Sequence, residues 1–293
     1  MTDMVKILVL GGTRFFGKRL VEKLLQEKHE VTIATRGVTA DEFGNRIKRL
    51  IVNREDEEML QELLDGEFYD VVYDNLCYNP NTAKIICNVL QKKVGKYIMT
   101  SSMAVYEPAL SLKEDDFDSY QYPIVYGDRK DFSYEEGKRL AEAVLFTYAT
   151  FPVIAVRFPV VIGENDYTKR LQFYVDHIVK QTPFGVEDIE GRMSFIHEKE
   201  AGDFLAWLST IETEGPINAC SNDTISMREV IEYIEEHTGI RAYIETKRDP
   251  IAPYNEILNC TLDNTKAKEL GFRFNWVKTN INDVLQYYIE QLR

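Results

Sequence analysis

The stretch KILVLGGTRFFGKRLVEKLL, Lys6 to Leu25, decides the fold class of this chain. It passes from an apolar strand through paired glycines into a helical pattern, in which apolar residues recur three and four positions apart. A strand that ends in a tight glycine turn brings backbone N–H groups and a helix N-terminus onto a phosphate. Gly11, Gly12 and Gly17 meet that need. The stretch therefore predicts a dinucleotide-binding loop.

Strand-like runs and helical patterns alternate through the first half of the chain. The apolar runs begin near Val5, Glu30, Arg49, Tyr69, Lys96 and Phe151. Helical patterns cover residues 17–28, 56–64, 80–92 and 133–150. Continuous apolar strands buried on both faces require a parallel sheet covered by helices. We therefore predict an α/β fold with a Rossmann-type doubly wound parallel sheet.

After Gly163 the pattern changes to longer helices and isolated short strands. Ser226 and Glu229 have the spacing of a capping box, which predicts the start of one of these helices. We expect an NAD(P)-binding Rossmann domain over residues 1–165, joined by 194–222. A smaller α/β substrate-binding lobe is expected over residues 166–193 and 223–293.

Composition narrows the classes of function. The chain has 293 residues, 44% of them hydrophobic, and a formal net charge of -13. That charge repels nucleic acid and anionic membranes, so neither partner is expected. No apolar run is long enough to span a membrane and no signal peptide is evident, so we expect a cytoplasmic protein. The cysteines lack metal-type spacing, and no metal site is expected.

The end of the second strand indicates the preferred cofactor. Proteins that bind NAD typically carry an acidic residue there for the ribose 2′-hydroxyl. This chain has Thr35 and Arg36 instead, and Arg14 stands inside the glycine loop. Two guanidinium groups suit the 2′-phosphate of NADP(H). We therefore expect NADP(H) as cofactor, with NAD as the alternative.

A known family shares these features. GGTRFFG resembles the GGTGFIG loop of the extended short-chain dehydrogenase/reductases, the NAD(P)-dependent epimerase/dehydratase family. Arg14 replaces the middle glycine, as in an atypical branch that includes chloroplast stem-loop-binding-like proteins. YIMTSSMAVYE, SYEEGKRLAEAVL and VRFPVVIG resemble the family's SS-x-x-VYG, Tyr-x-x-x-Lys and RP-x-NVYG segments, in the same order. The resemblance covers essentially the whole chain.

The resemblance implies an oxidoreductase or epimerase that acts by hydride transfer on a sugar-like or other small carbonyl or hydroxyl substrate. Together with the glycine loop and the two arginines, it indicates which residues surround the cofactor. These are Gly11, Gly12, Thr13, Arg14, Phe15, Phe16, Gly17, Arg36, Asn75, Ser101 and Lys138. Asn75 is equally explained as a turn former.

The expected catalytic residues are Tyr134, Lys138 and Ser102. A free tyrosine has a pKa near 10, so as a base it needs a nearby cation. Ser133 and Glu136 have capping-box spacing, which would place Tyr134 first in a helix and Lys138 one turn later. Ser102 matches the position of the family's catalytic Ser/Thr and could donate to the substrate oxygen.

A rival pair, Tyr126 and Lys130, has the same spacing. We favour Tyr134 because the helix signal begins at Ser133 and GKRLAE follows Tyr134 as the family pattern expects. His197 is better explained as a structural histidine than as a base.

Several positions depart from the family. Met103 and Ala104 stand where dehydratases carry Asp-Glu, so dehydration is disfavoured. Val160 and Met193 stand where members acting on nucleotide sugars tend to have Asn and Arg, with Arg192 displaced by one. A nucleotide sugar is therefore one possible substrate among several.

Two further possibilities concern the chain's role and its assembly. A non-catalytic NADP(H)-binding regulatory protein, or an RNA-associated protein of the atypical branch, is the alternative function. A homodimer is possible, since Leu140, Val144, Phe146 and Tyr148 give residues 133–150 more apolar surface than one sheet-facing stripe requires.

Overall fold

Parallel strands form the central sheet of the computed structural model, which describes residues 4–246, 248–257 and 259–292. The strand order is β3-β2-β1-β4-β5-β6-β11, which confirms the predicted fold class. The strands are β1 (Lys6–Leu10), β2 (Glu30–Thr35), β3 (Lys48–Ile51), β4 (Tyr69–Asp74), β5 (Val94–Ser102), β6 (Val153–Phe158) and β11 (Gly215–Asn218). The order reverses between β1 and β4, and ligands of such sheets bind at the strand ends beside that reversal.

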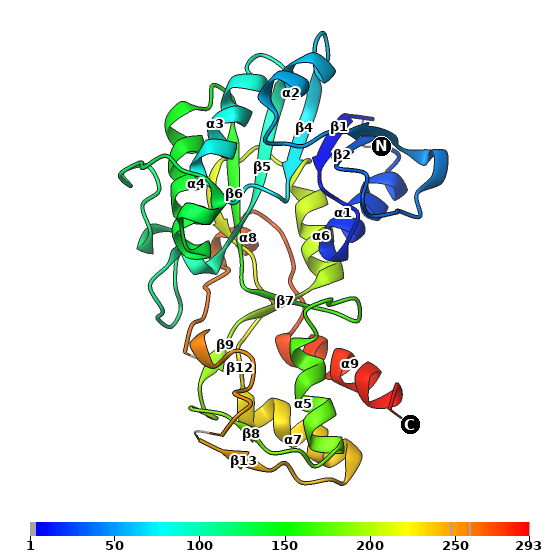
Figure 1. The fold of residues 1–293 in the computed structure, drawn as a ribbon, viewed down its shortest axis with the longest axis vertical. Coiled ribbons are helices and arrows are strands. Elements are labelled where there is room, and N and C mark those ends of the chain that lie inside the picture. Colours follow the sequence, from blue (N-terminus) through cyan, green and yellow to red (C-terminus); the bar gives the residue numbers. More distant parts are fainter. Residues whose placement is uncertain (1–3, 247, 258, 293) are drawn as a thin grey trace. The chain divides into compact units, whose positions relative to one another are not determined.

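Helices cover both faces of this sheet (Figure 1). On one face lie α1 (Phe15–Gln26) and α6 (Glu198–Leu208), and on the other lie α2 (Glu57–Leu63), α3 (Pro80–Val89) and α4 (Tyr134–Tyr148). Gly202 of α6 meets α1 closely, because a Cβ there would lie 2.7 Å from Arg19 Cβ. Within the described ranges, no helix is sufficiently long and apolar to cross a membrane.

The contacts divide the chain into two units. Unit 1 contains the sheet and consists of Met1–Glu107, Glu114–Phe158 and Ala201–Ala219. Unit 2 consists of Pro108–Lys113, Pro159–Glu200 and Cys220–Arg293. Unit 1 is thus assembled from three stretches of chain, and the short segment after β5 belongs to unit 2.

Unit 2 has its own apolar core. Its helices are α5 (Arg170–Val179), α7 (Met227–Thr238), α8 (Thr265–Glu269) and α9 (Val277–Glu290). Among the described residues, short strands accompany them in pairs, namely β7 (Val160–Ile162) with β10 (Phe195–His197), β9 (Arg192–Met193) with β12 (Ile225–Ser226), and β8 (Phe184–Gly185) with β13 (Ile244–Glu245). Phe184, Ile234 and Leu285 are fully buried in this core. The predicted capping box of Ser226 and Glu229 begins α7, as expected.

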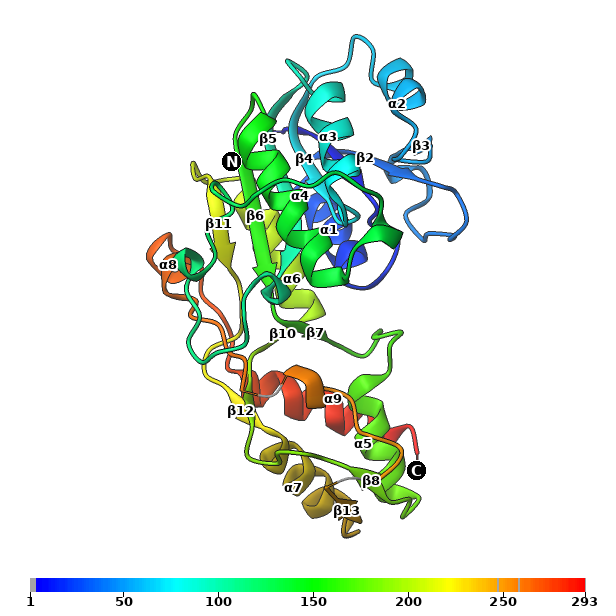
Figure 2. The same cartoon turned by 60° about the vertical axis from the view of Figure 1, so that its left-hand side comes forward.

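The apolar face of α4 is occupied within unit 1. Leu140 and Val144 are fully buried, and α4 lies beside α3 (Figure 2). The ring of Phe146 packs against Tyr120, with the ring centroids 4.6 Å apart. The segment before α4 therefore covers part of the apolar surface that suggested a homodimer. Tyr148 remains 42% exposed, and the homodimer stays a prediction.

Candidate active site

The loop between β1 and α1 has the backbone of a phosphate cradle. Gly11 and Gly12 adopt positive φ angles of 101° and 95°, which favour glycine. A Cβ on Gly17 would lie 3.2 Å from Gly12 Cα, so this position also has little room for a side chain. Arg14 has an extended backbone, with φ at -137° and ψ at 153°. An arginine is therefore tolerated where the family pattern has glycine.

Apart from Arg14, the residues that follow the glycine pair are partly buried within unit 1. Thr13 and Phe15 are half-buried. The ring of Phe16 lies 5.8 Å from that of Phe158, measured between centroids. This contact anchors the start of α1 to the end of β6.

Asn75 follows β4 and faces the loop. Its Oδ1 accepts a hydrogen bond of 2.8 Å from Thr100 Oγ1. Its Nδ2 is buried and has no hydrogen-bond partner among the described residues. A Cβ on Gly17 would lie 3.2 Å from that Nδ2. A buried donor without a partner beside a glycine cradle fits a bound dinucleotide, which would supply acceptors.

Arg14 and Arg36 are both exposed. In the part of the chain that the structure describes, neither guanidinium makes a hydrogen bond or ion pair. Asp41, in the loop after β2, is engaged by Arg49 through contacts of 2.6 and 2.9 Å. Glu42 pairs with a lysine of α1 at 2.6 Å. The acidic groups of this loop are thus neutralised while both predicted phosphate ligands remain available.

Lys138 lies on α4 and is fully buried beneath the site. Its Nζ donates to the carbonyl oxygens of Cys77 at 2.8 Å and Thr100 at 2.7 Å. Burial lowers the pKa of Lys138 to about 8. An ammonium group has three protons, so one remains for a ligand.

Tyr134 is the first residue of α4, as predicted. The helix is capped by Ser133, whose Oγ accepts from the backbone N–H of Glu136 at 3.2 Å. Lys138 Nζ lies 5.9 Å from the centroid of the Tyr134 ring. Tyr134 is 42% exposed, so a ligand can reach it from the solvent side. The structure therefore brings this phenol and this ammonium group together.

Tyr78 and Gly137 explain how α4 approaches so closely. The Tyr78 ring lies over Lys138, with Nζ 4.4 Å from its centroid, and its centroid is 6.2 Å from that of Tyr134. A Cβ on Gly137 would lie only 2.4 Å from the Tyr78 carbonyl oxygen. Only glycine allows this distance without movement of the backbone. Neither contact has a signal in the sequence, because both depend on the loop after β4.

Three consecutive hydroxyl groups end β5, and they point to different partners. Thr100 Oγ1 donates to Asn75, and Ser101 Oγ donates to the buried carboxylate of Glu142. Ser102 Oγ instead accepts from the backbone N–H of Ala104 at 3.2 Å, which leaves its own proton to donate. The side chain of Ser101 is thus directed into the protein, and any contact with cofactor would fall to its backbone.

The rival pair does not share a helix. Tyr126 lies in a loop, and Lys130 lies in the short 3₁₀ helix η4 (Arg129–Asp131). Partial burial and a hydrogen bond to Tyr148 raise the pKa of Tyr126 to about 12. Such a phenol is a poor base near neutral pH.

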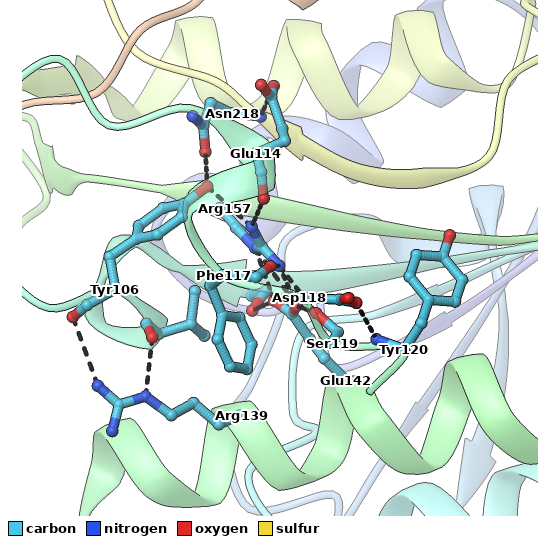
Figure 3. Close-up of polar contacts among 12 residues, drawn as sticks. Tyr106, Glu114, Phe117, Asp118, Ser119, Tyr120, Arg139, Glu142, Arg157 and Asn218 are labelled. Atoms are coloured by element: carbon cyan, nitrogen blue, oxygen red, sulfur yellow. Dashed lines mark hydrogen bonds and ion pairs between the residues drawn. The ribbon is translucent and has the colours of Figure 1, made fainter. Parts of the chain in front are cut away.

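Two buried ion pairs beside the site were not predicted. Arg54 pairs with Asp74 at the end of β4, and the hydroxyl of Tyr97 donates to the same carboxylate at 2.6 Å. Arg157 of β6 pairs with Glu142 of α4 at 2.7 Å (Figure 3). Asp74 and Arg157 lie at or near the carboxyl ends of parallel strands, which is the signal that could have identified them.

In unit 2, the departures from the family pattern are apolar and buried. Val160 and Met193 belong to its core. The Arg192 guanidinium donates to Thr224 Oγ1 at 2.7 Å and pairs with Glu229 at 3.4 Å. His197 lies 3.4 Å from Glu164 and accepts from the backbone of Lys199.

Comparison with known proteins supports the resemblance drawn from the sequence. Residues 7–77 match the model of the NAD dependent epimerase/dehydratase family. UDP-glucuronic acid decarboxylase 6 of Arabidopsis thaliana is 28% identical over 91% of this chain and 83% of that protein. The chain is an enzyme that resembles the NAD-dependent epimerase/dehydratase family, as the sequence predicted.

Two further comparisons concern a relative that matches part of the chain and a solved structure that shares its fold. The chloroplast stem-loop binding protein of 41 kDa b from Arabidopsis thaliana is 34% identical, over 34% of this chain and 30% of that protein. The Bordetella bronchiseptica enzyme WbmG, solved in complex with NAD and UDP, matches with a TM-score of 0.77 at 15% identity. That match covers 99% of this chain and 95% of the other, and it shows the shared fold.

Proposed function

We propose that this enzyme is an NADP(H)-dependent oxidoreductase or epimerase that acts on a hydroxyl-bearing or carbonyl carbon of a sugar-like or other small substrate. The observation that carries the proposal is the position of the buried Lys138 ammonium group, 5.9 Å from the ring of Tyr134 and one helical turn away. Tyrosine with a cation beside it can exchange a proton near neutral pH.

Each residue of the set would have a separate role. When bound, the nicotinamide supplies the hydride acceptor or donor. Tyr134 would take the proton from a substrate hydroxyl, or return it to a carbonyl oxygen. Lys138 would favour the phenolate and use its third proton on a ribose hydroxyl. Ser102 would donate its free proton to the same substrate oxygen.

The preference for NADP(H) rests on Arg14 and Arg36. Both are exposed and, in the described ranges, lack a protein partner. A bidentate guanidinium contact to a phosphate is stronger than a neutral hydrogen bond. Asn75 and the glycine loop would hold the diphosphate side of the cofactor, as the orphaned Nδ2 supports.

The substrate class follows from two opposing observations. The decarboxylase relatives act on UDP-glucuronic acid by name, and WbmG was solved with UDP. However, Val160 and Met193 are buried apolar residues at positions where side chains that bind a diphosphate would be polar. We therefore propose a sugar-like substrate in which a diphosphate is not required. Met103 and Ala104 provide no acid or base, so water elimination is not part of the proposal.

The test compares two tyrosine variants. Purified enzyme is incubated with NADP+ or NADPH and a panel that includes UDP-glucose, UDP-glucuronic acid, free sugars and small ketones. Turnover is followed by nicotinamide absorbance and by mass spectrometry of products. We expect Tyr134→Phe to lower kcat at least about 100-fold while cofactor binding persists, and Tyr126→Phe to match wild type. Cofactor binding without any turnover would favour the regulatory alternative, and the reverse pattern would reassign the base.

A further inference from the structure

Ser102 lies at the start of a short turn. The position of this turn has to be fixed if the Ser102 hydroxyl is to donate a proton to the substrate oxygen. After β5 the chain forms the 3₁₀ helix η2 (Met103–Val105), capped by Ser102. The Ala104 N–H donates to Ser102 Oγ and so orients the hydroxyl. A displacement of this turn by about 1 Å would cost on the order of 100-fold in rate.

Helix α4 forms hydrogen bonds to the backbone before and after this turn. Lys138 donates to the carbonyl oxygen of Thr100, before Ser102. Its neighbour Arg139 donates through Nε to the carbonyl oxygen of Val105, after Ser102, at 2.7 Å. Figure 3 shows Arg139 reaching from α4 toward the backbone at Tyr106. Two consecutive residues of the helix that carries Tyr134 therefore bracket the segment that carries Ser102.

Arginine suits this task better than lysine. Its planar group places two donors in a fixed direction, and a second nitrogen lies 3.5 Å from the Tyr106 carbonyl oxygen. The Arg139 side chain is only 18% exposed, whereas its carboxylate partners are more exposed, Glu107 at 2.8 Å to 88% and Glu136 at 3.7 Å to 33%. The backbone contact with Val105 is thus the shielded one.

We propose that Arg139 is a positioning residue that couples Ser102 to the helix of Tyr134 and Lys138. It acts by holding η2 through the Val105 carbonyl group, without contacting the substrate. The inference rests on the proposed function, because it assigns Arg139 an effect on Ser102 as a proton donor.

The test is a double-mutant cycle between Arg139 and Ser102, with the substrate from the panel above that turns over fastest. Arg139→Met should lower kcat about 10- to 100-fold, with the cofactor Kd unchanged. In a Ser102→Ala background the same change should have no further effect. Arg139→Lys should recover part of the loss. Glu107→Gln, which keeps the Val105 contact, is the matched control and should behave as wild type.

A second measurement separates the two proposals. Hydrogen exchange at the Ala104 amide reports the turn without any substrate, and Arg139→Met should accelerate it while the melting temperature changes little. Unchanged exchange, or a kcat loss that multiplies with Ser102→Ala, would overturn the role of Arg139. Wild-type turnover in Ser102→Ala and Tyr134→Phe would instead overturn the proposed function.

Discussion

The guanidinium group of Arg157 and the carboxylate of Glu142 lie 2.7 Å apart, and both side chains are fully excluded from solvent. The pair joins β6 to α4. Arg157 also donates to the carbonyl oxygen of Glu114 at 2.8 Å and to Ser119 Oγ at 2.8 Å (Figure 3). The segment that leads back into unit 1 from Pro108–Lys113 is therefore fastened to this pair.

Removing one partner should destabilise the enzyme strongly. Arg157→Met leaves the Glu142 charge buried without its partner, and we expect a loss of about 3–5 kcal/mol in the free energy of unfolding. Arg157→Met combined with Glu142→Met should lose less than the sum of the single changes, because no buried charge remains. Urea denaturation of the four proteins measures this. Strict additivity would show that the two side chains do not interact.

The arginine pair should decide cofactor preference. Arg14→Ala and Arg36→Ala should each weaken NADPH binding about 10-fold or more, since each removes a charged contact to the 2′-phosphate. NADH binding should change little. The melting temperature at equal concentrations of the two cofactors provides the measurement. Arg273→Ala, at an exposed arginine of unit 2, is the control. Equal shifts with both cofactors in wild type would contradict the NADP(H) assignment.

Gly137 should tolerate no side chain. In Gly137→Ala the added Cβ would lie 2.4 Å from the Tyr78 carbonyl oxygen. Either α4 or the loop after β4 therefore has to move. We expect a loss of about 1–3 kcal/mol in stability, as for other overpacked sites. Turnover should fall as well, because the move displaces Lys138. Thr147→Ala, at an exposed position of the same helix, should leave both quantities near wild type. A fully active Gly137→Ala enzyme would show that the close approach is dispensable.

The buried ammonium group should also make stability depend on pH in a defined window. The pKa of Lys138 falls from 10.5 to about 8 on folding. Between these values the unfolded chain binds a proton that the folded chain has released, so the free energy of unfolding rises with pH.

Comparison with Lys138→Met isolates this effect. The free energy of unfolding of wild type should rise relative to that of the variant by at most about 1.4 kcal/mol per pH unit in that window. At lower pH, where Lys138 is protonated in both states, the difference should be flat. Denaturation series across the window test this. A difference that is constant throughout would show that the pKa of Lys138 is not lowered.

Local patterns were enough to predict the sheet, the main helices and the start of α4. The apolar strands and the Ser133 cap are properties of short stretches, so the sequence contains them directly. The glycine turn between β1 and α1 could be predicted for the same reason. The helix α7 and its capping box at Ser226 followed equally from a spacing of three residues.

Contacts between distant residues could not be predicted in this way. Lys138 finds its acceptor at Cys77, 61 positions earlier, and Arg139 finds Val105, 34 positions earlier. Phe146 was interpreted as part of an apolar surface available to a dimer, but its ring packs against Tyr120 of the preceding segment. Each of these contacts depends on how a distant segment folds back onto the sheet. The spacing of residues within one segment does not predict that.

The edge strand β11 has a consequence for dissecting the enzyme. It pairs with β6 but forms only after the chain has passed through the whole of Pro159–Glu200, which belongs to unit 2. A fragment ending at Phe158 would expose the backbone of β6 as an open edge and would lose the Asn218 amide that accepts from Tyr106. Open edges recruit other strands, so such a truncated polypeptide should aggregate on expression. Circular permutants that keep β11 continuous with β6 are the better route to an isolated unit 1.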